Sequence, residues 1–381
     1  MAGILYLYAQ TYRAGSVHAR RAVQMLAMLR AAGHPADLLT FPGGDPWPDG
    51  LVDRVFRTAS IPFGRSLPTY GFGPRRCWAT LVLAVAAVRL VLRRHYTVVH
   101  CADRALRVGG FVSWLFGTRF VFEWNTTSGR DLVRWLRQRP KRFRRSVRLI
   151  LSDVPYPFSR LRATGLAGRI ATIPMLPHPR IRRQMMPAVR MRGTVQPFRL
   201  TVLSMNRPTD ALAPILEALP TLTDAYPNIS VRICFGHTDR QSTRFQALLT
   251  ECFGVTAEVL PEPCDAQTFT EAVQGTDLVF LPACGGVLPP PTLLDLMTAG
   301  VALLAVRCRA YTSLLNDSNA ALVAPCAADV AAAVIRHMAS PLLCAEHADA
   351  VCESIAADRS YTLSVAALRS CYAFALSEPT E

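Results

Sequence analysis

The sequence predicts an α/β protein built from two Rossmann-like, doubly wound domains that face a central cleft. Short apolar runs alternate with helical stretches, as in parallel β-α-β units, and the alternation restarts near Phe198 after a proline-rich break. The formal charge changes sign across the same break. A length of 381 residues favours two domains, and 51% hydrophobic with 18% charged residues excludes intrinsic disorder.

The first half opens with a strand, a loop and a helix. Ile4–Tyr8 is apolar, Thr11–Ser16 is a loop, and apolar residues recur at helical spacing through Val17–Ala32. Gly33 ends this helix, because glycine accepts the backbone conformation that follows a helix C-terminus. The next expected strands are Ala36–Thr40, Tyr96–His100 and Arg119–Phe122.

The same pattern restarts after residues 174–198, which are rich in proline and arginine and show little periodicity. The expected strands are Phe198–Leu203, Val231–Phe235, Ala257–Leu260, Leu278–Leu281 and Val301–Val306. The expected helices are Leu212–Leu222, Thr243–Phe253, Phe269–Val273, Leu293–Ala299, Ala327–Ala339 and Ala345–Ala357. We therefore predict a first domain over residues 1–186, a linker over 187–197, a second domain over 198–360 and a closing helical segment over 361–381.

Basic residues concentrate in the first half. Residues 1–195 contain 32 arginines and lysines against 8 acidic residues, a net charge of +24, whereas residues 196–381 contain 10 against 19, a net charge of −9. A basic surface of this size attracts a polyanion, either nucleic acid or an anionic membrane. No recognisable nucleic-acid-binding module accompanies the charge, so we expect an anionic membrane surface and no nucleic acid as the partner.

Two stretches of the first half are candidate membrane contacts. Trp78–Leu92 is too short for a spanning helix, so it predicts either a buried core helix or a helix lying on a membrane. Arg134–Arg148 interleaves arginines with aromatic side chains, and there Arg142, Arg144 and Arg145 are the expected contacts, the alternative being an ordinary solvated face. The apolar N-terminus is too short for a signal sequence, so we expect a cytoplasmic protein peripheral to the inner face of the membrane.

The sequence offers no support for metal or dinucleotide chemistry. Its eleven cysteines form no C-x-x-C pair and no metal-like spacing with histidine, which indicates reduced thiols. Glycine-rich dinucleotide and P-loop motifs are missing, which disfavours oxidoreductases and NTPases. We expect neither a metal nor a cofactor.

The segment 275–306 is the most informative part of the chain. A strand ends in Pro282, a loop with Gly285 and Gly286 follows, and the next helix contains Asp295. A glycine-rich loop before a helix brings backbone N–H groups to a place where a diphosphate binds. This segment resembles the donor site of GT-B glycosyltransferases, specifically family 4, in which an acidic residue of the helix accepts hydrogen bonds from ribose.

The resemblance extends over most of the chain. Gly15 and Ser16 match the family's first glycine loop, and Gly236 lies in the loop after its second C-domain strand. Arg207 matches the arginine of a basic pair that neutralises the diphosphate leaving group. These residues, with Gly285, Gly286 and Asp295, are the expected donor-binding set.

The resemblance implies a retaining transfer of a hexosyl or other sugar from a nucleotide-sugar, held by the second domain, to a glycan or lipid-linked acceptor on the first. It also implies that the closing helix, Leu363–Leu376, returns to the first domain. Glu123 and Asn125 follow one another closely at a strand end and are the candidate catalytic residues. The alternative is that Glu123 is a buried, satisfied acid and that Asn125 is structural.

Three positions depart from the family pattern. Val287 stands where the family has the first of its two glutamates, Asp210 lies about where a lysine belongs, and Asn125 replaces a histidine that contacts the sugar. The alternative function is therefore a GT-B-like protein that has lost turnover and acts as a binding or scaffolding partner. Donor hydrolysis by the purified protein distinguishes the two.

Overall fold

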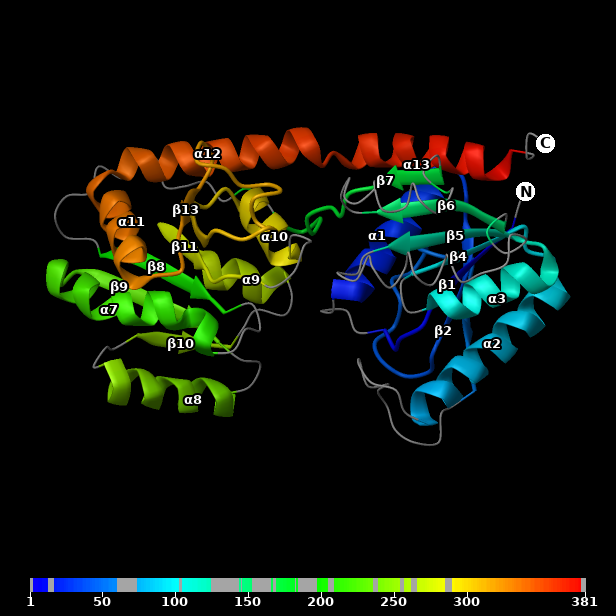
Figure 1. The fold of residues 1–381 in the computed structure, drawn as a ribbon, viewed down its shortest axis with the longest axis horizontal. Helices are drawn as coiled ribbons and strands as arrows, with labels where there is room; N and C mark the ends of the chain where they lie inside the picture. The colour runs from blue at the N-terminus through cyan, green and yellow to red at the C-terminus, as the bar shows by residue number, and fades with distance from the viewer. Residues whose placement is uncertain are drawn as a thin grey trace. The chain divides into compact units, whose positions relative to one another are not determined.

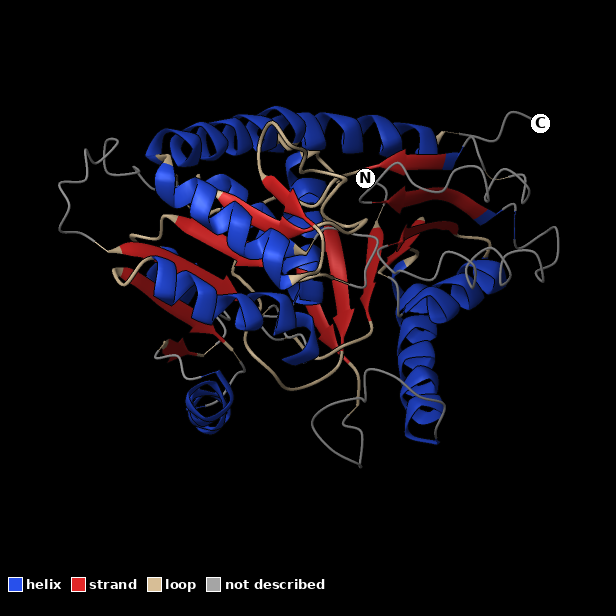
Figure 2. Ribbon diagram, turned by 60° about the vertical axis from the view of Figure 1, so that its left-hand side comes forward, coloured by secondary structure: helices blue, strands red, loops and turns tan. Residues whose placement is uncertain are grey.

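The computed structural model describes most of the chain. The described residues are 3–12, 17–59, 74–102, 105–124, 144, 146–152, 166, 169–181, 183, 197–204, 209–235, 239–253, 257–261, 266–284 and 290–377. The chain divides into two compact units, Met1–Met175 with Ser360–Glu381, and Leu176–Arg359. Each unit is an α/β domain with its own parallel sheet (Figures 1 and 2).

A parallel sheet forms the centre of the first unit. Its strand order within the described residues is β3-β2-β1-β4-β5-β6-β7. The strands are β1 (Ile4–Tyr8), β2 (Ala36–Thr40), β3 (Arg54–Arg57), β4 (Val98–Cys101), β5 (Arg119–Trp124), β6 (Val147–Ser152) and β7 (Ile170–Thr172). Tyr6 of β1 pairs with Leu38 of β2 on one side and with His100 of β4 on the other. The winding direction therefore reverses between β1 and β4, and doubly wound sheets bind ligands at such a switch point.

Helices from both ends of the chain complete this unit. They are α1 (Val17–Ala31), α2 (Pro74–Arg94), α3 (Leu106–Phe116) and α13 (Tyr361–Leu376). Helix α13 packs against α1, β5 and β6. Arg369 donates to the carbonyl of Ala31, and the Tyr372 hydroxyl lies 2.5 Å from Nδ1 of His100. The last helix of the chain is thus part of the first sheet's core.

A second parallel sheet forms the centre of the other unit, in the order β10-β9-β8-β11-β12-β13 within the described residues. Its strands are β8 (Phe198–Leu203), β9 (Ile229–Cys234), β10 (Glu258–Leu260), β11 (Leu278–Leu281), β12 (Leu303–Val306) and β13 (Ala321–Val323). Its helices are α7 (Ala213–Ala225), α8 (Asp239–Leu248), α9 (Ala266–Val273), α10 (Pro291–Ala299), α11 (Ala327–Ala339) and α12 (Pro341–Asp358). The winding direction reverses between β8 and β11.

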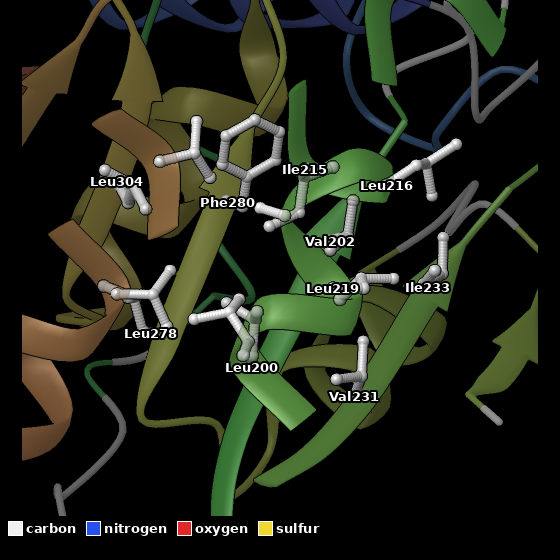
Figure 3. Close-up of a cluster of buried hydrophobic side chains, with 14 of the residues drawn as sticks. Leu200, Val202, Ile215, Leu216, Leu219, Val231, Ile233, Leu278, Phe280 and Leu304 are labelled. Atoms are coloured by element: carbon white, nitrogen blue, oxygen red, sulfur yellow. The ribbon is translucent and has the colours of Figure 1, made fainter. Parts of the chain in front are cut away.

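The second sheet and α7 share an apolar core (Figure 3). Leu200 and Val202 alternate along β8 and therefore point to the same face of the sheet. Ile215, Leu216 and Leu219 recur at helical spacing on α7 and pack onto that face. Each of these side chains is almost completely buried and contributes about 1.5–3 kcal/mol relative to exposure. This core thus combines apolar residues that alternate along a strand with apolar residues that recur at helical spacing.

The structure contains strands that the apolar pattern did not predict. Strand β3 reads RVFR and is largely exposed at the sheet edge, so it lacks an apolar run. Strands β7 and β13 have three residues each, too few for a periodic signal, and they too lie at sheet edges. Strand β6 is largely apolar and buried, but its first two residues belong to the arginine-rich stretch Arg134–Arg148, which obscured it.

The boundary between the units lies before the predicted position at residue 186. The backbone N–H of His178 donates to Oδ1 of Asp295 at 2.9 Å, and Arg183 forms an ion pair with Asp349. These contacts place residues 176–181 and 183 in the second unit. Of the predicted linker 187–197, Pro197 is the part that falls within the described residues.

The predicted apolar stretch Trp78–Leu92 is the central part of α2. Its Ala79, Leu83 and Ala87 are buried in the core of the first unit. No single helix among the described residues is long and apolar enough to span a membrane. One bent pair, Ala327–Ala339 with Pro341–Leu376, meets that requirement by length and composition alone.

We predict that Gly109→Ala destabilises the first unit, although alanine is the better helix former. A Cβ on Gly109 of α3 would lie 2.8 Å from Cε2 of Phe120 and 2.9 Å from Sγ of Cys101, both of them buried side chains. Overpacking of this kind costs about 1–3 kcal/mol. The free energy of unfolding in urea, followed by tryptophan fluorescence, is the measurement, since all five tryptophans belong to the first unit.

The control is Leu115→Ala on the same helix, because the Leu115 side chain is exposed. It should change the free energy of unfolding by less than about 0.5 kcal/mol. Equal losses in the two variants would contradict the packing argument.

Candidate functional site

The residues expected to bind the donor follow three neighbouring strands of the second sheet. Arg207 comes after β8, Gly236 after β9, and Gly285 with Gly286 after β11. Strand β8 lies between β9 and β11, and parallel strands end at the same edge of their sheet. These four residues lie outside the described residues, but the strands that lead to them end together at the switch point of this unit.

Asp295 is the member of this set that the structure describes. It lies on α10 with 7% of its surface exposed, and its Oδ1 accepts the backbone N–H of His178 at 2.9 Å. The carboxylate therefore has a structural task that the sequence did not reveal, which is to hold the segment entering the second unit.

The start of α10 offers fewer backbone donors than the resemblance led us to expect. Pro290 is the N-cap and Pro291 the first helical residue, and neither carries an N–H group. The N–H of Leu293 donates to the carbonyl of Pro290. Amide donors for a diphosphate therefore have to come from the glycine loop and not mainly from this helix end.

Glu123 of β5 lies at the centre of a buried polar cluster in the first unit. The Tyr6 hydroxyl donates to Oε1 at 2.5 Å, and Nε of Arg21 donates to Oε2 at 3.0 Å. Nε2 of His100 lies 3.3 Å from Oε1, and Nδ1 of the same ring contacts the Tyr372 hydroxyl. Glu123 and His100 have no exposed surface. The cluster joins β1, β4 and β5 to α1 and α13.

The surroundings of Glu123 keep it ionised. Burial acts to raise the pKa of Glu123, but the contact with His100, the positive charge of Arg21 and the hydroxyl of Tyr6 outweigh it and lower the pKa to about 2. Burial, together with the charge of Glu123, raises the pKa of Tyr6 and of Tyr372 well above the usual value. The carboxylate is thus a permanent negative charge with no path to a substrate.

The catalytic role of Glu123 stays a prediction, and these contacts favour the structural alternative. Residues from three other elements, β1, α1 and β4, contact this fully buried group, as is typical of a structural acid, the alternative recognised from the sequence. Its partners Tyr6 and Arg21 are distant in sequence and gave no motif that could have identified them. Asn125, the other candidate catalytic residue, and the glycine-loop residues Gly15 and Ser16 lie outside the described residues.

Of the three arginines expected to contact a membrane, the structure describes Arg144. Its Nε atom is buried and its backbone carbonyl accepts a hydrogen bond from Arg169, so the residue is partly built into the domain and is not a free surface cation. Arg142 and Arg145 lie outside the described residues.

A pair of adjacent helices in the first unit exposes apolar side chains. Helices α2 and α3 pack together (Figure 1). We call the following residues the α2–α3 apolar surface, each 41% to 59% exposed: Trp78, Leu81, Val85, Leu92, Phe111, Trp114 and Leu115. The α2 residues recur at helical spacing, and exposed arginines at 89 and 93 adjoin them. Helix α2 therefore buries one face, as predicted for a core helix, and exposes a second apolar face. The exposed apolar residues of α3 were not predicted, although the apolar run Trp114–Phe116 at the end of the helix could have indicated them.

Among the described residues, no group of three or more His, Cys, Asp or Glu side chains could hold a metal ion.

Solved structures show which fold this arrangement belongs to. Sucrose-phosphate synthase from Thermosynechococcus elongatus matches 99% of the chain at a TM-score of 0.66 and 16% identity, and all of that protein is covered. HepE from Anabaena, in complex with UDP or with UDP-glucose, matches 98% of the chain and 100% of its own length at a TM-score of 0.68 and 13% identity. The match to a glycosyltransferase from Rickettsia africae covers 99% of this chain and 99% of that protein, at a TM-score of 0.64 and 12% identity.

No protein-family model and no curated protein matches the sequence. The structural neighbours are GT-B glycosyltransferases, and the chain has the GT-B fold.

Proposed function

We propose that this GT-B protein is a glycosyltransferase that moves a sugar from a nucleotide-sugar to a glycan or lipid-linked acceptor. The main support is the match over nearly the whole chain to HepE, which was solved with UDP and with UDP-glucose. The segment that resembles a donor site follows β11, next to the switch point of the second sheet. The fold likeness supports nucleotide-sugar binding, and the sequence resemblance supports this edge of the second sheet as its place.

The proposed chemistry is electrostatic. Arg207 and the amides of Gly236, Gly285 and Gly286 would stabilise the charge that develops on the departing diphosphate. Asp295, on the helix that follows the glycine loop, would accept a hydrogen bond from a ribose hydroxyl. We propose a retaining, family-4-like transfer that requires neither a metal nor a cofactor.

A second candidate function, binding without turnover, is favoured by specific residues. Val287 can neither bind a sugar hydroxyl nor stabilise charge, and Asp210 is an exposed acid near the position of an expected lysine. Release of free glucose from UDP-glucose, or transfer to an added acceptor, supports the enzyme. Saturable UDP-glucose binding with no turnover supports the binding protein.

We predict that Arg207→Ala lowers the affinity for UDP by about tenfold or more. The variant loses one or two charge-assisted hydrogen bonds to the diphosphate, worth about 1.5–3 kcal/mol each. Isothermal titration calorimetry with UDP is the measurement. The control is Arg336→Ala, because Arg336 is exposed in the last turn of α11. Helix α11 starts after the carboxyl end of β13, so its last turn lies away from the carboxyl edge of the sheet, where the donor is proposed to bind. Unchanged UDP affinity in Arg207→Ala would refute the donor-site assignment.

We also propose that the first unit docks on the inner face of an anionic membrane through the α2–α3 apolar surface. Tryptophan and phenylalanine side chains on a helix face suit the boundary between head groups and acyl chains. Exposed Arg89 and Arg93 on α2 suit the anionic head groups, and most of the unit comes from residues 1–195, which carry a net charge of +24. Docking would bring the protein to a lipid-linked acceptor and would make it peripheral on the cytoplasmic side.

We predict that combining Leu81→Ser with Trp114→Ser weakens binding to anionic vesicles by about tenfold or more, because both side chains would leave the lipid boundary. Combining Arg89→Gln with Arg93→Gln should weaken it about 10- to 30-fold, at roughly 1 kcal/mol per basic residue. Co-sedimentation with vesicles of increasing anionic lipid content is the measurement, and wild-type binding should fall with salt.

The matched control is Leu342→Ser with Phe374→Ser, which removes an exposed leucine and an exposed aromatic residue outside the α2–α3 apolar surface. This pair should bind as the wild type does. Equal partition of the wild type onto neutral and anionic vesicles, or onto neither, would rule out the docking proposal.

We predict that Glu123→Gln unfolds the first unit without a specific effect on transfer chemistry. The change leaves Arg21 buried without its counter-charge, which costs about 3–5 kcal/mol. The pKa of Glu123 is about 2 in the fold and has an ordinary value of 4.5. Its contribution to stability is therefore complete above pH 4.5 and is lost as the pH falls towards 2. Urea unfolding followed by tryptophan fluorescence at several pH values measures both effects.

Asp53→Asn is the control, since Asp53 is half exposed in its pair with Arg30 and should contribute little. A Glu123→Gln variant of normal stability that had lost turnover would show that the catalytic role expected from the sequence was right.

A further inference from the structure

We propose that Cys284 and Cys308 are an oxidation site, a dithiol that a hydroperoxide converts to a reversible intramolecular disulfide. Their Sγ atoms lie 3.6 Å apart. Nothing in the proposed transfer reaction uses either thiol, so this site is independent of the proposed function.

The pair is a product of strand register. Leu281 of β11 is opposite Ala305 of β12 in the parallel ladder. Cys284 and Cys308 each lie three residues beyond that pair, so the segments that continue β11 and β12 bring them side by side just past the carboxyl edge of the sheet. Neighbouring strands are about 4.8 Å apart, within the Cα separation of about 4.4–6.8 Å that a disulfide spans. Small side-chain rotations are therefore enough to close the bond.

A second contact holds the same two segments together. The hydroxyl of Tyr311, which follows Cys308, donates to the carbonyl of Pro282, which precedes Cys284, at 2.8 Å. The Tyr311 side chain is completely buried. Because this bond exists without a disulfide, the sulfurs are held within reach of each other in the reduced protein.

The surroundings assign different roles to the two thiols. The hydrogen bond with Cys284 lowers the pKa of the Cys308 thiol well below its usual range; partial burial opposes this, and the backbone amides near Tyr311 and Ala310 assist it. Cys308 is half-buried and reachable, whereas Cys284 has 7% of its surface exposed. Cys308 is thus the attacking thiolate and Cys284 the resolving thiol.

The chemistry balances with a hydroperoxide as the oxidant. The Cys308 thiolate attacks the terminal peroxide oxygen, the O–O bond breaks, and Cys308 becomes a sulfenic acid as hydroxide or an alkoxide leaves and takes a proton from solvent. The Cys284 sulfur then attacks Sγ of Cys308, the S–O bond breaks, and water leaves after taking up the Cys284 proton. Two thiols are oxidised by two electrons and one peroxide is reduced. An external thiol reverses the bond by exchange.

The test is hydrogen peroxide treatment of the reduced full-length protein, followed by alkylation and peptide mass spectrometry. We expect a cross-linked peptide containing Cys284 and Cys308 that has lost two hydrogens and is restored by dithiothreitol. Cys308 should be consumed about tenfold faster than Cys326, an exposed cysteine that serves as the internal reference.

Two variants separate the roles, and thermal melting first shows that each is folded. Cys284→Ser should leave Cys308 as a sulfenic acid that dimedone captures, whereas Cys308→Ser should give neither the cross-link nor a dimedone adduct at Cys284. Cys326→Ser should cross-link as the wild type does. Oxidation of Cys326 ahead of Cys308, disulfides between molecules instead of within one, or no dimedone adduct in folded Cys284→Ser would each overturn the proposal. The readout needs no nucleotide, so a failure of UDP binding leaves it intact.

Discussion

The first unit depends on a single buried negative charge. Glu123 is inaccessible to water, and such a charge is tolerated only when donors surround it. Arg21 supplies the counter-charge from α1, and Tyr6 supplies a hydroxyl from the central strand β1. Arg21 also donates to the carbonyl of Ile173, just beyond β7, so one guanidinium joins the carboxylate to the far edge of the sheet. The order of strands and helices around this charge is therefore specified by polar geometry as well as by apolar packing.

The apolar pattern predicted most of the central strands because they are buried on both faces. Ile4–Tyr8 and Leu278–Leu281 were recognised with their observed bounds, since every residue in them is buried. Edge strands such as Arg54–Arg57 were missed, because an edge strand is stabilised by one neighbour and tolerates charged side chains. The local sequence pattern therefore predicts buried strands well, and it predicts strands that pair at the edge of a sheet poorly.

The sequence predicts an edge of the second sheet for the candidate site, and it does not predict the contacts of the site's residues. Strand ends and glycines locate the edge at which a nucleotide would bind, because that location follows from parallel winding alone. The bond between Asp295 and the amide of His178 was not predictable, since it depends on a segment 117 residues away in the chain. The partners of Glu123 were not predictable for the same reason, because Tyr6 and Arg21 lie more than 100 residues away in sequence. Residues that come together only in the tertiary fold have no characteristic spacing in the sequence from which their contact could be predicted.

The chain path around the second unit has a consequence for the order of synthesis. Residues 176–359 form a complete sheet whose strands and helices are contiguous in sequence, whereas the first unit takes its last helix from residues 361–376. The ribosome therefore releases every part of the second unit before it releases Tyr372, which closes the cluster around His100 and Glu123. Domains generally fold as units as they emerge. The part of the protein that is translated first is accordingly the part that finishes folding last, and until then the surfaces of α1, β5 and β6 that α13 covers stay open to chaperones.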